Sequence, residues 1–175
     1  GHAVFDKFIN QDLPWELRTH VHIFATEAIA MFFGRLIYDA DWLKNTLNLS
    51  ALEVNNIKED CKNSLKYDQL VFSRWAQVVF RFEKSMYANP DQDLNALWWS
   101  LVEKYQLVKK PEGRNEPDYA SKIHIALYPA YYHNYLLGEL LASQFYYYIT
   151  DKVLHLKEDD DKSFYNKKDL GGYFS

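Results

Sequence analysis

Apolar residues recur at helical spacing along most of this chain, and no stretch shows the strict alternation of a half-buried strand. The clearest example is residues 56–87, where apolar side chains keep a helical period and Lys, Glu and Arg occupy the opposite face. We predict one long helix there, or two. A further helix is predicted from Leu94 to Tyr105, with Asp91 or Asp93 as its N-cap. The pattern as a whole indicates an all-α fold.

The run from Val21 to Tyr38 is almost wholly apolar and contains one acid, Glu27. A helix here would surround Glu27 with apolar side chains, and a lone buried carboxylate costs several kcal/mol unless a cation lies against it. Arg35 is about two helical turns further on, so it is not the neighbouring cation. Both charges would be costly in lipid, which argues against a membrane span. We predict a buried core helix whose Glu27 has a partner elsewhere.

The segment before this run holds a candidate partner for the acid. Residues 3–10 are predicted to continue a first helix, Pro14 lies in the break that follows, and a short helix is predicted from about Trp15. His2 lies 25 positions before Glu27. Imidazole and carboxylate groups are common zinc ligands, and catalytic zinc takes three protein ligands and keeps one position for water. On spacing alone, a solvent-facing Glu27 and an unattached His2 are an equally open alternative.

A second group of polar side chains lies in the apolar stretch from 120 to 149. Lys122 and His124 alternate with two isoleucines, which predicts a short extended segment with both polar side chains on one side. Pro129 then stops this segment, and a helix is predicted from near Tyr131.

Two phenols of this predicted helix, Tyr132 and Tyr135, lie three residues apart and share one face. A tyrosine hydroxyl and a histidine N–H can stabilise the oxyanion of a tetrahedral intermediate, and a lysine with a second tyrosine can hold a carboxylate. Taken singly, tyrosines of such helices are more commonly core residues whose hydroxyls are satisfied. Tyr128 and Tyr131 form another pair three apart, so the tyrosine register is less secure than the Lys-x-His pair.

Several motifs occur in the order found in the angiotensin-converting-enzyme-like zinc peptidases, that is, peptidyl-dipeptidase A and its bacterial relatives. The chain opens with Gly-His-Ala and continues with an Asp-Leu-Pro turn, a Leu-Arg pair, Glu-Ala-Ile, Lys-x-His, a proline and Tyr-x-x-Tyr. In order, these are Gly1 to Ala3, Asp12 to Pro14, Leu17 with Arg18, Glu27 to Ile29, Lys122 with His124, Pro129, and Tyr132 with Tyr135. The chain resembles this family over nearly its whole length, including the helix that contains DLNALWW.

The resemblance implies a zinc site. His2 would be the second ligand and Glu27 the third, while the first His and the general-base Glu of a His-Glu-x-x-His motif would precede Gly1. The implied fold is a multi-helical portion of a larger helical gluzincin-type peptidase. The implied activity is zinc-dependent release of dipeptides from the C-termini of peptide substrates.

The resemblance also implies roles for the second group. Lys122 and Tyr132 would bind the C-terminal carboxylate of the substrate, and His124 and Tyr135 would stabilise the transition state. The chain departs from the animal enzymes in two ways: one extra residue separates His124 from the tyrosine pair, and Asn134 stands where those enzymes have an arginine associated with chloride activation. Chloride dependence is therefore not implied.

We expect residues 1–175 to form a single helical domain, the C-terminal part of such a catalytic domain, beginning within His-Glu-x-x-His and shortened at its C-terminus. Alone, it would lack the general base and one ligand, so we expect weak metal binding, no peptidase activity, and self-association through surface that the rest of the protein covers. Two other classes are open: another gluzincin oligopeptidase, and a non-catalytic helical binding module.

Composition narrows the remaining choices. Hydrophobic residues make up 48% and aromatic residues 17% of the chain, which excludes disorder. A net charge of -4 without a basic stripe argues against nucleic acid as a partner. The single Cys61 can form no internal disulfide, so the compartment stays open, periplasmic and extracellular locations included. The charged run at 157–162 is predicted to be an exposed turn.

Overall fold

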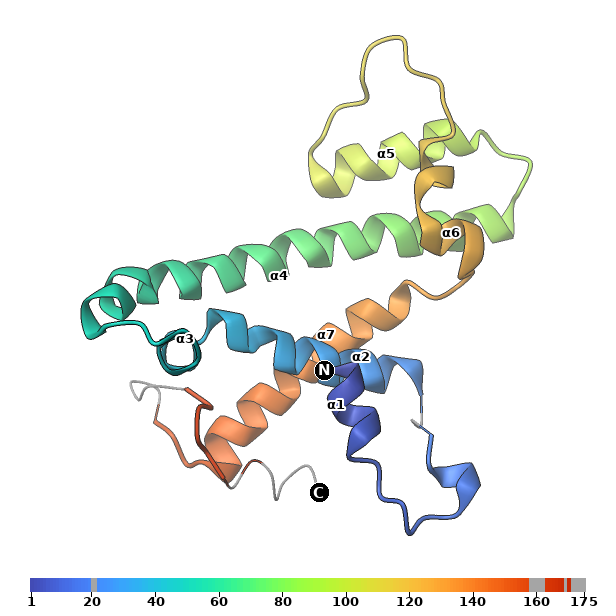
Figure 1. The fold of residues 1–175 in the computed structure, drawn as a ribbon. Helices are drawn as coiled ribbons and strands as arrows, with labels where there is room; N and C mark the ends of the chain where they lie inside the picture. Colours follow the sequence, from blue (N-terminus) through green and yellow to red (C-terminus); the bar gives the residue numbers. More distant parts are fainter. Residues whose placement is uncertain (20–21, 158–162, 169, 171–175) are drawn as a thin grey trace. The chain divides into compact units, whose positions relative to one another are not determined.

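The computed structural model describes residues 1–19, 22–157, 163–168 and 170. Among these residues there is no strand, and the all-α prediction is confirmed. The α-helices are α1 (His2–Lys7), α2 (Ile23–Gly34), α3 (Ala40–Leu47), α4 (Ala51–Ala88), α5 (Leu94–Gln106), α6 (Ile123–Leu127) and α7 (His133–Tyr148) (Figure 1). Short 3₁₀ turns cover Trp15–Leu17, Arg35–Tyr38 and Asp118–Ser121, and a π-helical turn, Ile149–Val153, follows α7.

The chain divides into two compact units. The terminal unit contains the described residues of 1–66 and 137–175, and the central unit contains residues 67–136. The division falls inside α4 and inside α7, so both helices contribute residues to both units. The two units are described separately below.

The predicted long helix is a single helix of 38 residues, α4. Ser50 begins it with a capping box: its hydroxyl accepts the Glu53 N–H, and the Glu53 carboxylate accepts the Ser50 N–H at 2.8 Å. Asp93 is the N-cap of α5, as one of the two predicted choices, and accepts the N–H of Ala96 at 2.9 Å. The capping box places the start of α4 at Ala51, five residues before the predicted start at 56, whereas Asp93 places the start of α5 at Leu94, as predicted.

In the terminal unit, α2 is the buried helix that the apolar run predicted. Its buried residues include Glu27, Ala28 and Phe32, and it ends at Gly34, where a 3₁₀ turn continues to Tyr38. α1 packs on α2. It ends at Lys7, three residues before the predicted end of the first helix.

In the central unit, α5 runs beside the later half of α4, and the loop after α5 leads to the turn before α6 (Figure 1). The core between these helices is aromatic and β-branched: Val78, Val79 and Phe82 of α4 are fully buried. The rings of Phe82 and Trp98 meet edge to face with centroids 5.2 Å apart. This core supports the segment that carries the second group of predicted site residues.

The predicted extended segment around Lys122 is wrong. Lys122 alone is extended; it is the N-cap of α6, and its carbonyl accepts the N–H of Ile125 at 2.9 Å. The two-residue alternation of Lys and His was too short to separate strand from helix, and Ile125 packs against the core from a helical turn instead. α7 begins at His133, two residues after the predicted start near Tyr131.

The described residues contain no helix that is both long and apolar enough to span a membrane. Residues 158–162 of the predicted exposed turn lie outside the described part of the chain.

Candidate functional site

The first candidate site lies in the terminal unit, where α1 brings His2 to Glu27 of α2. His2 Nε2 lies 3.4 Å from Glu27 Oε2. Glu27 is only 6% exposed, as the sequence predicted, whereas about half of the His2 side chain is exposed. The open alternative of a solvent-facing Glu27 is therefore wrong. The imidazole of His2, which can carry a positive charge, is a partner of the buried Glu27 carboxylate.

Thr26 orients this imidazole, and sequence reasoning did not find it. Its hydroxyl lies 2.9 Å from His2 Nδ1, and Thr26 is buried beside Glu27. When Nδ1 carries the hydrogen and donates it to the threonine oxygen, the Nε2 lone pair faces the carboxylate. The sequence alone does not reveal the contact between Thr26 and His2, because only the packing of α1 decides which ring nitrogen lies near the hydroxyl.

Two glycines let the backbones come close enough to form this pair. A side-chain carbon on Gly1 would lie 2.2 Å from the Cα of Ala30, and one on Gly138 would lie 3.0 Å from the Cβ of Glu27. Real side-chain carbons essentially never make the first contact, and the second is tight enough that a neighbour must shift. Gly1 and Gly138 thus fit against α2 where larger residues do not.

The pair fits two ligand positions of a zinc site. Two ligands at about 2.0–2.1 Å from a tetrahedral zinc lie about 3.3 Å apart, close to the observed separation of 3.4 Å. Imidazoles bound to zinc usually donate their other ring N–H to an oxygen acceptor, and the Thr26 oxygen is such an acceptor for His2 Nδ1. Within the described residues, however, no group of three or more His, Cys, Asp or Glu side chains could hold a metal. The structure therefore contains two members of the predicted ligand set.

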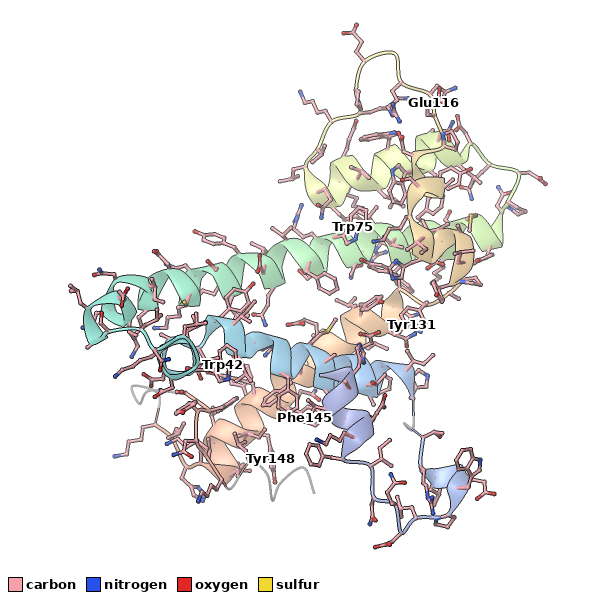
Figure 2. The ribbon with its side chains drawn as sticks, in the orientation of Figure 1. Trp42, Trp75, Glu116, Tyr131, Phe145 and Tyr148 are labelled. Atoms are coloured by element: carbon pink, nitrogen blue, oxygen red, sulfur yellow. The ribbon has the colours of Figure 1, made fainter. Side chains whose placement is uncertain are left out.

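The second candidate site lies in the central unit and contains Lys122, His124, Tyr132 and Tyr135. Lys122 Nζ lies 5.1 Å from the ring centroid of Tyr132 and 5.5 Å from that of Trp75, which projects from α4 (Figure 2). No described acid forms an ion pair with this ammonium group. Its pKa is below the ordinary lysine value because the group is partly buried. The ammonium is thus held by ring faces rather than by a carboxylate.

Tyr132 is buried, 4% exposed, and its hydroxyl oxygen accepts the indole N–H of Trp75 at 2.7 Å. Burial raises the pKa of this phenol above its ordinary value, so the group keeps its hydrogen at neutral pH. Trp75 was predicted as part of the apolar face of the long helix, and its polar edge was missed. The spacing of apolar residues predicts the helix face on which Trp75 lies, but not the group that its indole N–H contacts.

His124 and Tyr135 lie next to this pair. His124 Nε2 and the Tyr135 hydroxyl are 3.1 Å apart. The rings of Tyr132 and Tyr135 are 5.1 Å apart between centroids, so the four predicted residues form one cluster. The rings of Tyr128 and Tyr131 pack around the same imidazole, each 6.2 Å from it. The Tyr132 hydroxyl bonds to Trp75 and the Tyr135 hydroxyl bonds to His124, so both tyrosines proposed from the sequence have polar partners in this cluster.

Glu83 of α4 holds the turn that presents this cluster. It is 4% exposed, and its carboxylate accepts the N–H of Ala130 at 2.9 Å and the N–H of Tyr132. Ala130 has a φ of 54°, a left-handed conformation that is unusual for alanine. Burial raises the pKa of Glu83, while these two N–H groups and the nearby His133 act in the opposite direction. The prediction that acids of this helix occupy a solvent face is wrong for Glu83.

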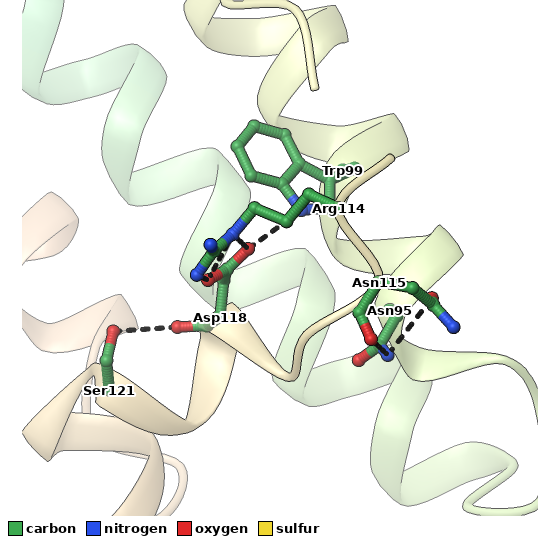
Figure 3. A network of polar contacts seen from close by, with 6 residues as sticks. All are labelled: Asn95, Trp99, Arg114, Asn115, Asp118 and Ser121. Atoms are coloured by element: carbon green, nitrogen blue, oxygen red, sulfur yellow. Dashed lines mark hydrogen bonds and ion pairs between the residues drawn. The ribbon is translucent and has the colours of Figure 1, made fainter. Parts of the chain in front are cut away.

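An open groove of about 800 Å³ lies beside Trp75 of α4 and under the loop that follows α5. Trp98 and Trp99 line it together with the loop residues that include Arg114. Asp118 closes one end: it accepts the indole N–H of Trp99 at 3.1 Å and forms an ion pair with Arg114 (Figure 3). Arg114 lowers the pKa of Asp118. This network ties the loop to α5.

Glu139 of α7 is paired with Arg35. Their side chains are 2.5 Å apart, and the guanidinium also donates to the hydroxyl of Ser143 at 2.7 Å. Both charged groups are mostly buried, so this pair joins α7 to the end of α2. His22 is exposed and accepts the N–H of Phe24 as the N-cap of α2.

Comparison of the chain with models of protein families, with curated proteins and with solved structures finds no match. Its function is therefore inferred from its residues and their geometry.

Proposed function

We propose that this chain is part of a zinc-dependent peptidase that releases dipeptides from the C-termini of peptides. The observation that carries the proposal is the approach of His2 Nε2 to Glu27 Oε2, 3.4 Å, across 25 positions of the sequence. The resemblance to the zinc peptidases implies that both side chains are zinc ligands. Their separation matches that of two ligands around one tetrahedral ion.

In this proposal, His2 and Glu27 hold zinc together with a histidine ahead of Gly1, and a glutamate ahead of Gly1 is the general base. Zinc, when bound, supplies a Lewis acid that polarises the scissile carbonyl and lowers the pKa of water. Thr26 holds the imidazole so that Nε2, not Nδ1, is available as the ligand atom.

Lys122 and Tyr132 bind the C-terminal carboxylate of the substrate. An ammonium that has ring faces around it, and no acidic partner within the described part of the chain, keeps its charge available for an anion from outside. A carboxylate would also accept the hydrogen of the Tyr132 hydroxyl. Recognition of a free C-terminus is what separates a peptidyl-dipeptidase from an oligopeptidase that cuts inside a peptide.

His124 and Tyr135 stabilise the oxyanion. At 3.1 Å, the imidazole and the phenol share a hydrogen bond, so the pair can direct one N–H or O–H toward a substrate oxygen that gains negative charge. Their fixed contact gives the donor its position before the substrate arrives, which is the requirement for electrostatic stabilisation of a transition state.

The test starts with the coding sequence ahead of Gly1, which should specify His-Glu-x directly before it. The protein that includes this segment should then cleave a peptide with a free C-terminus, lose activity with a chelator and regain it with zinc. Glu27→Gln should abolish the activity, whereas Glu53→Gln, an exposed acid of the N-terminal turn of α4, should not. Chelator-resistant cleavage, or no upstream His-Glu pair, would overturn the proposal and favour a helical binding module.

The same assay separates the two peptidase classes. A peptide with an amidated C-terminus should be cleaved much more slowly than the free acid. Equal cleavage of both would favour an oligopeptidase. The 175-residue chain alone, with two of three ligands, is expected to bind zinc weakly and to hydrolyse neither peptide; chelator-sensitive hydrolysis by this chain would contradict that expectation.

A further inference from the structure

We propose that Trp75 is the positioning residue of the carboxylate site: its indole N–H turns the Tyr132 hydroxyl toward the substrate, and its ring face holds the Lys122 ammonium. This inference rests on the proposed function, because it assigns Trp75 a role at the same carboxylate site. Trp75 itself touches neither the carboxylate nor the reacting atoms in this scheme. It acts through the two residues that do.

The direction of one hydrogen bond carries the first half of the inference. An indole nitrogen has a hydrogen and no acceptor lone pair, so in the 2.7 Å contact Trp75 must donate and the Tyr132 oxygen must accept. A phenol that accepts in this contact still has its own hydrogen to donate. Among the described residues, the Tyr132 hydroxyl has no other hydrogen-bond partner, and its raised pKa keeps that hydrogen in place.

The position of the ammonium carries the second half. Lys122 Nζ lies within about 6 Å of two ring centroids, those of Trp75 and Tyr132, which is the range of a cation–π contact. The same indole therefore contacts the charged group through its face and the phenol through its edge. A charge and a hydroxyl donor are set side by side by one rigid ring, which is the pair of groups that a carboxylate requires.

Trp99 provides a matched control in the same unit. Its indole N–H also donates to a side-chain oxygen, that of Asp118, at 3.1 Å. Among the described residues, no hydrogen bond, ring contact or cation–π contact joins Trp99 to Lys122 or Tyr132. Replacing either tryptophan with phenylalanine removes one indole N–H and keeps an aromatic ring. Only Trp75→Phe removes a hydrogen bond at the proposed carboxylate site.

The experiment uses the 175-residue chain with ¹⁵N-labelled tryptophan and two probes, N-acetyl-alanyl-leucine and its C-terminal amide. The five indole N–H resonances are followed by NMR, and the signals of Trp75 and Trp99 are assigned from their phenylalanine variants. The free acid should shift the Trp75 signal and the amide should not. Tyr132→Phe should also move the Trp75 signal in the absence of probe, because the indole N–H loses its acceptor.

Affinities for the free acid then form a double-mutant cycle. Tyr132→Phe should weaken binding by about tenfold and Trp75→Phe by about threefold to fivefold. The double variant should bind no more weakly than Tyr132→Phe, because Trp75 orients a hydroxyl that is already gone. Trp99→Phe should bind as the wild type does. The other indole signals and the thermal midpoint of each variant report whether it is folded.

Three outcomes would overturn the inference. Wild-type affinity in Trp75→Phe, additive effects of the two substitutions, or an unmoved Trp75 signal in Tyr132→Phe would each show that the indole does not act through the phenol. In these cases, selective binding of the free acid would still support the proposed function. If the wild type binds acid and amide equally, carboxylate capture itself is wrong, and the proposed dipeptide release falls with the role of Trp75.

Discussion

The two candidate sites are built in opposite ways. In the terminal unit, His2 and Glu27 come from distant parts of the sequence, and their contact depends on the close backbone approach of Gly1 and Gly138 to α2. In the central unit, the predicted residues all lie within 122–135 and are joined by ring contacts and by the hydrogen bond between His124 and Tyr135, while a second hydrogen bond joins Tyr132 to Trp75 of α4. The first site depends on how closely the backbones pack, and the second depends on contacts between side chains.

This difference decides how each site should respond to substitution. A pair that depends on two backbones in van der Waals contact has no room for added volume, so the fold is disturbed along with the site. An aromatic cluster spreads its contacts over many ring faces. A single polar change there should alter ligand recognition before it alters stability. The predictions below test this contrast, beginning with the largest expected effect.

Gly138→Val should lower the free energy of unfolding by about 3 kcal/mol, because the added carbons meet the side chain of Glu27 and the backbone N–H of Ala28. Denaturant unfolding measures the change. Gly34→Ala is the control: nothing lies within 4 Å of its added carbon, and stability should stay within about 1 kcal/mol of the wild type. A Gly138→Val variant as stable as that control would show that the contact between α7 and α2 is loose.

Glu83→Ala should cost about 2 kcal/mol, because the N–H groups of Ala130 and Tyr132 lose their acceptor. Glu83→Gln keeps an acceptor and removes the charge. Since burial raises the pKa of Glu83 in the folded state, ionisation opposes folding, and this cost is present at neutral pH and lost as the pH falls toward the ordinary value of 4.5.

Glu83→Gln should therefore be more stable than the wild type at pH 7, and the two should converge near pH 4.5. Thermal unfolding at several pH values provides the measurement. A gap between the two proteins that widens on acidification would show that the Glu83 charge stabilises the fold.

Thr26→Val should weaken zinc binding to His2 and Glu27 by about tenfold, because the imidazole loses the hydroxyl that selects its ring nitrogen. Zinc titration by calorimetry measures the affinity. Thr150→Val is the matched control, since Thr150 is also buried in the terminal unit but bonds to the carbonyl of Tyr146. Equal loss of affinity in both variants would point to a general disturbance of the unit.

Lys122→Met should raise stability by up to about 1 kcal/mol while it removes the response to a free carboxylate. The lowered pKa of Lys122 means that its charged form is disfavoured in the folded state. That cost is present at neutral pH and disappears as the pH rises through the lowered pKa toward the ordinary value of 10.5. A destabilised variant at pH 7 would show that the ring contacts outweigh the cost of burying the ammonium.

The sequence predicted the helices best where the relevant forces are local. The period of apolar residues predicted α4 and α5, and Asp93 marked the start of α5, whereas the Ser50 capping box begins α4 five residues before the predicted start at 56. It failed at Lys122, where two polar residues alternated with two isoleucines over too few positions to separate a strand from one turn of helix. It also failed at Glu83, since a charged residue on a helix of mixed charge has no local sign that it is buried.

The candidate site residues show the same difference between what the sequence predicts and what only the structure shows. A lone acid in an apolar run determined, by desolvation alone, that Glu27 would be buried and would need a partner. The residue types of Lys122, His124 and the two tyrosines determined which groups they could bind. Only the tertiary structure decided that Thr26 orients His2, that Trp75 contacts both Lys122 and Tyr132, and that Glu139 is paired with Arg35.

The physical reason is the range of the forces. Helix period, capping and the cost of burying a charge act within a few residues, so the sequence by itself determined the helical class, the start of α5 and the need for a partner at Glu27. A hydrogen bond or a ring contact between distant residues depends on distances of a few ångströms. Those distances exist only after the backbones have packed, at contacts such as that of Gly138 with Glu27.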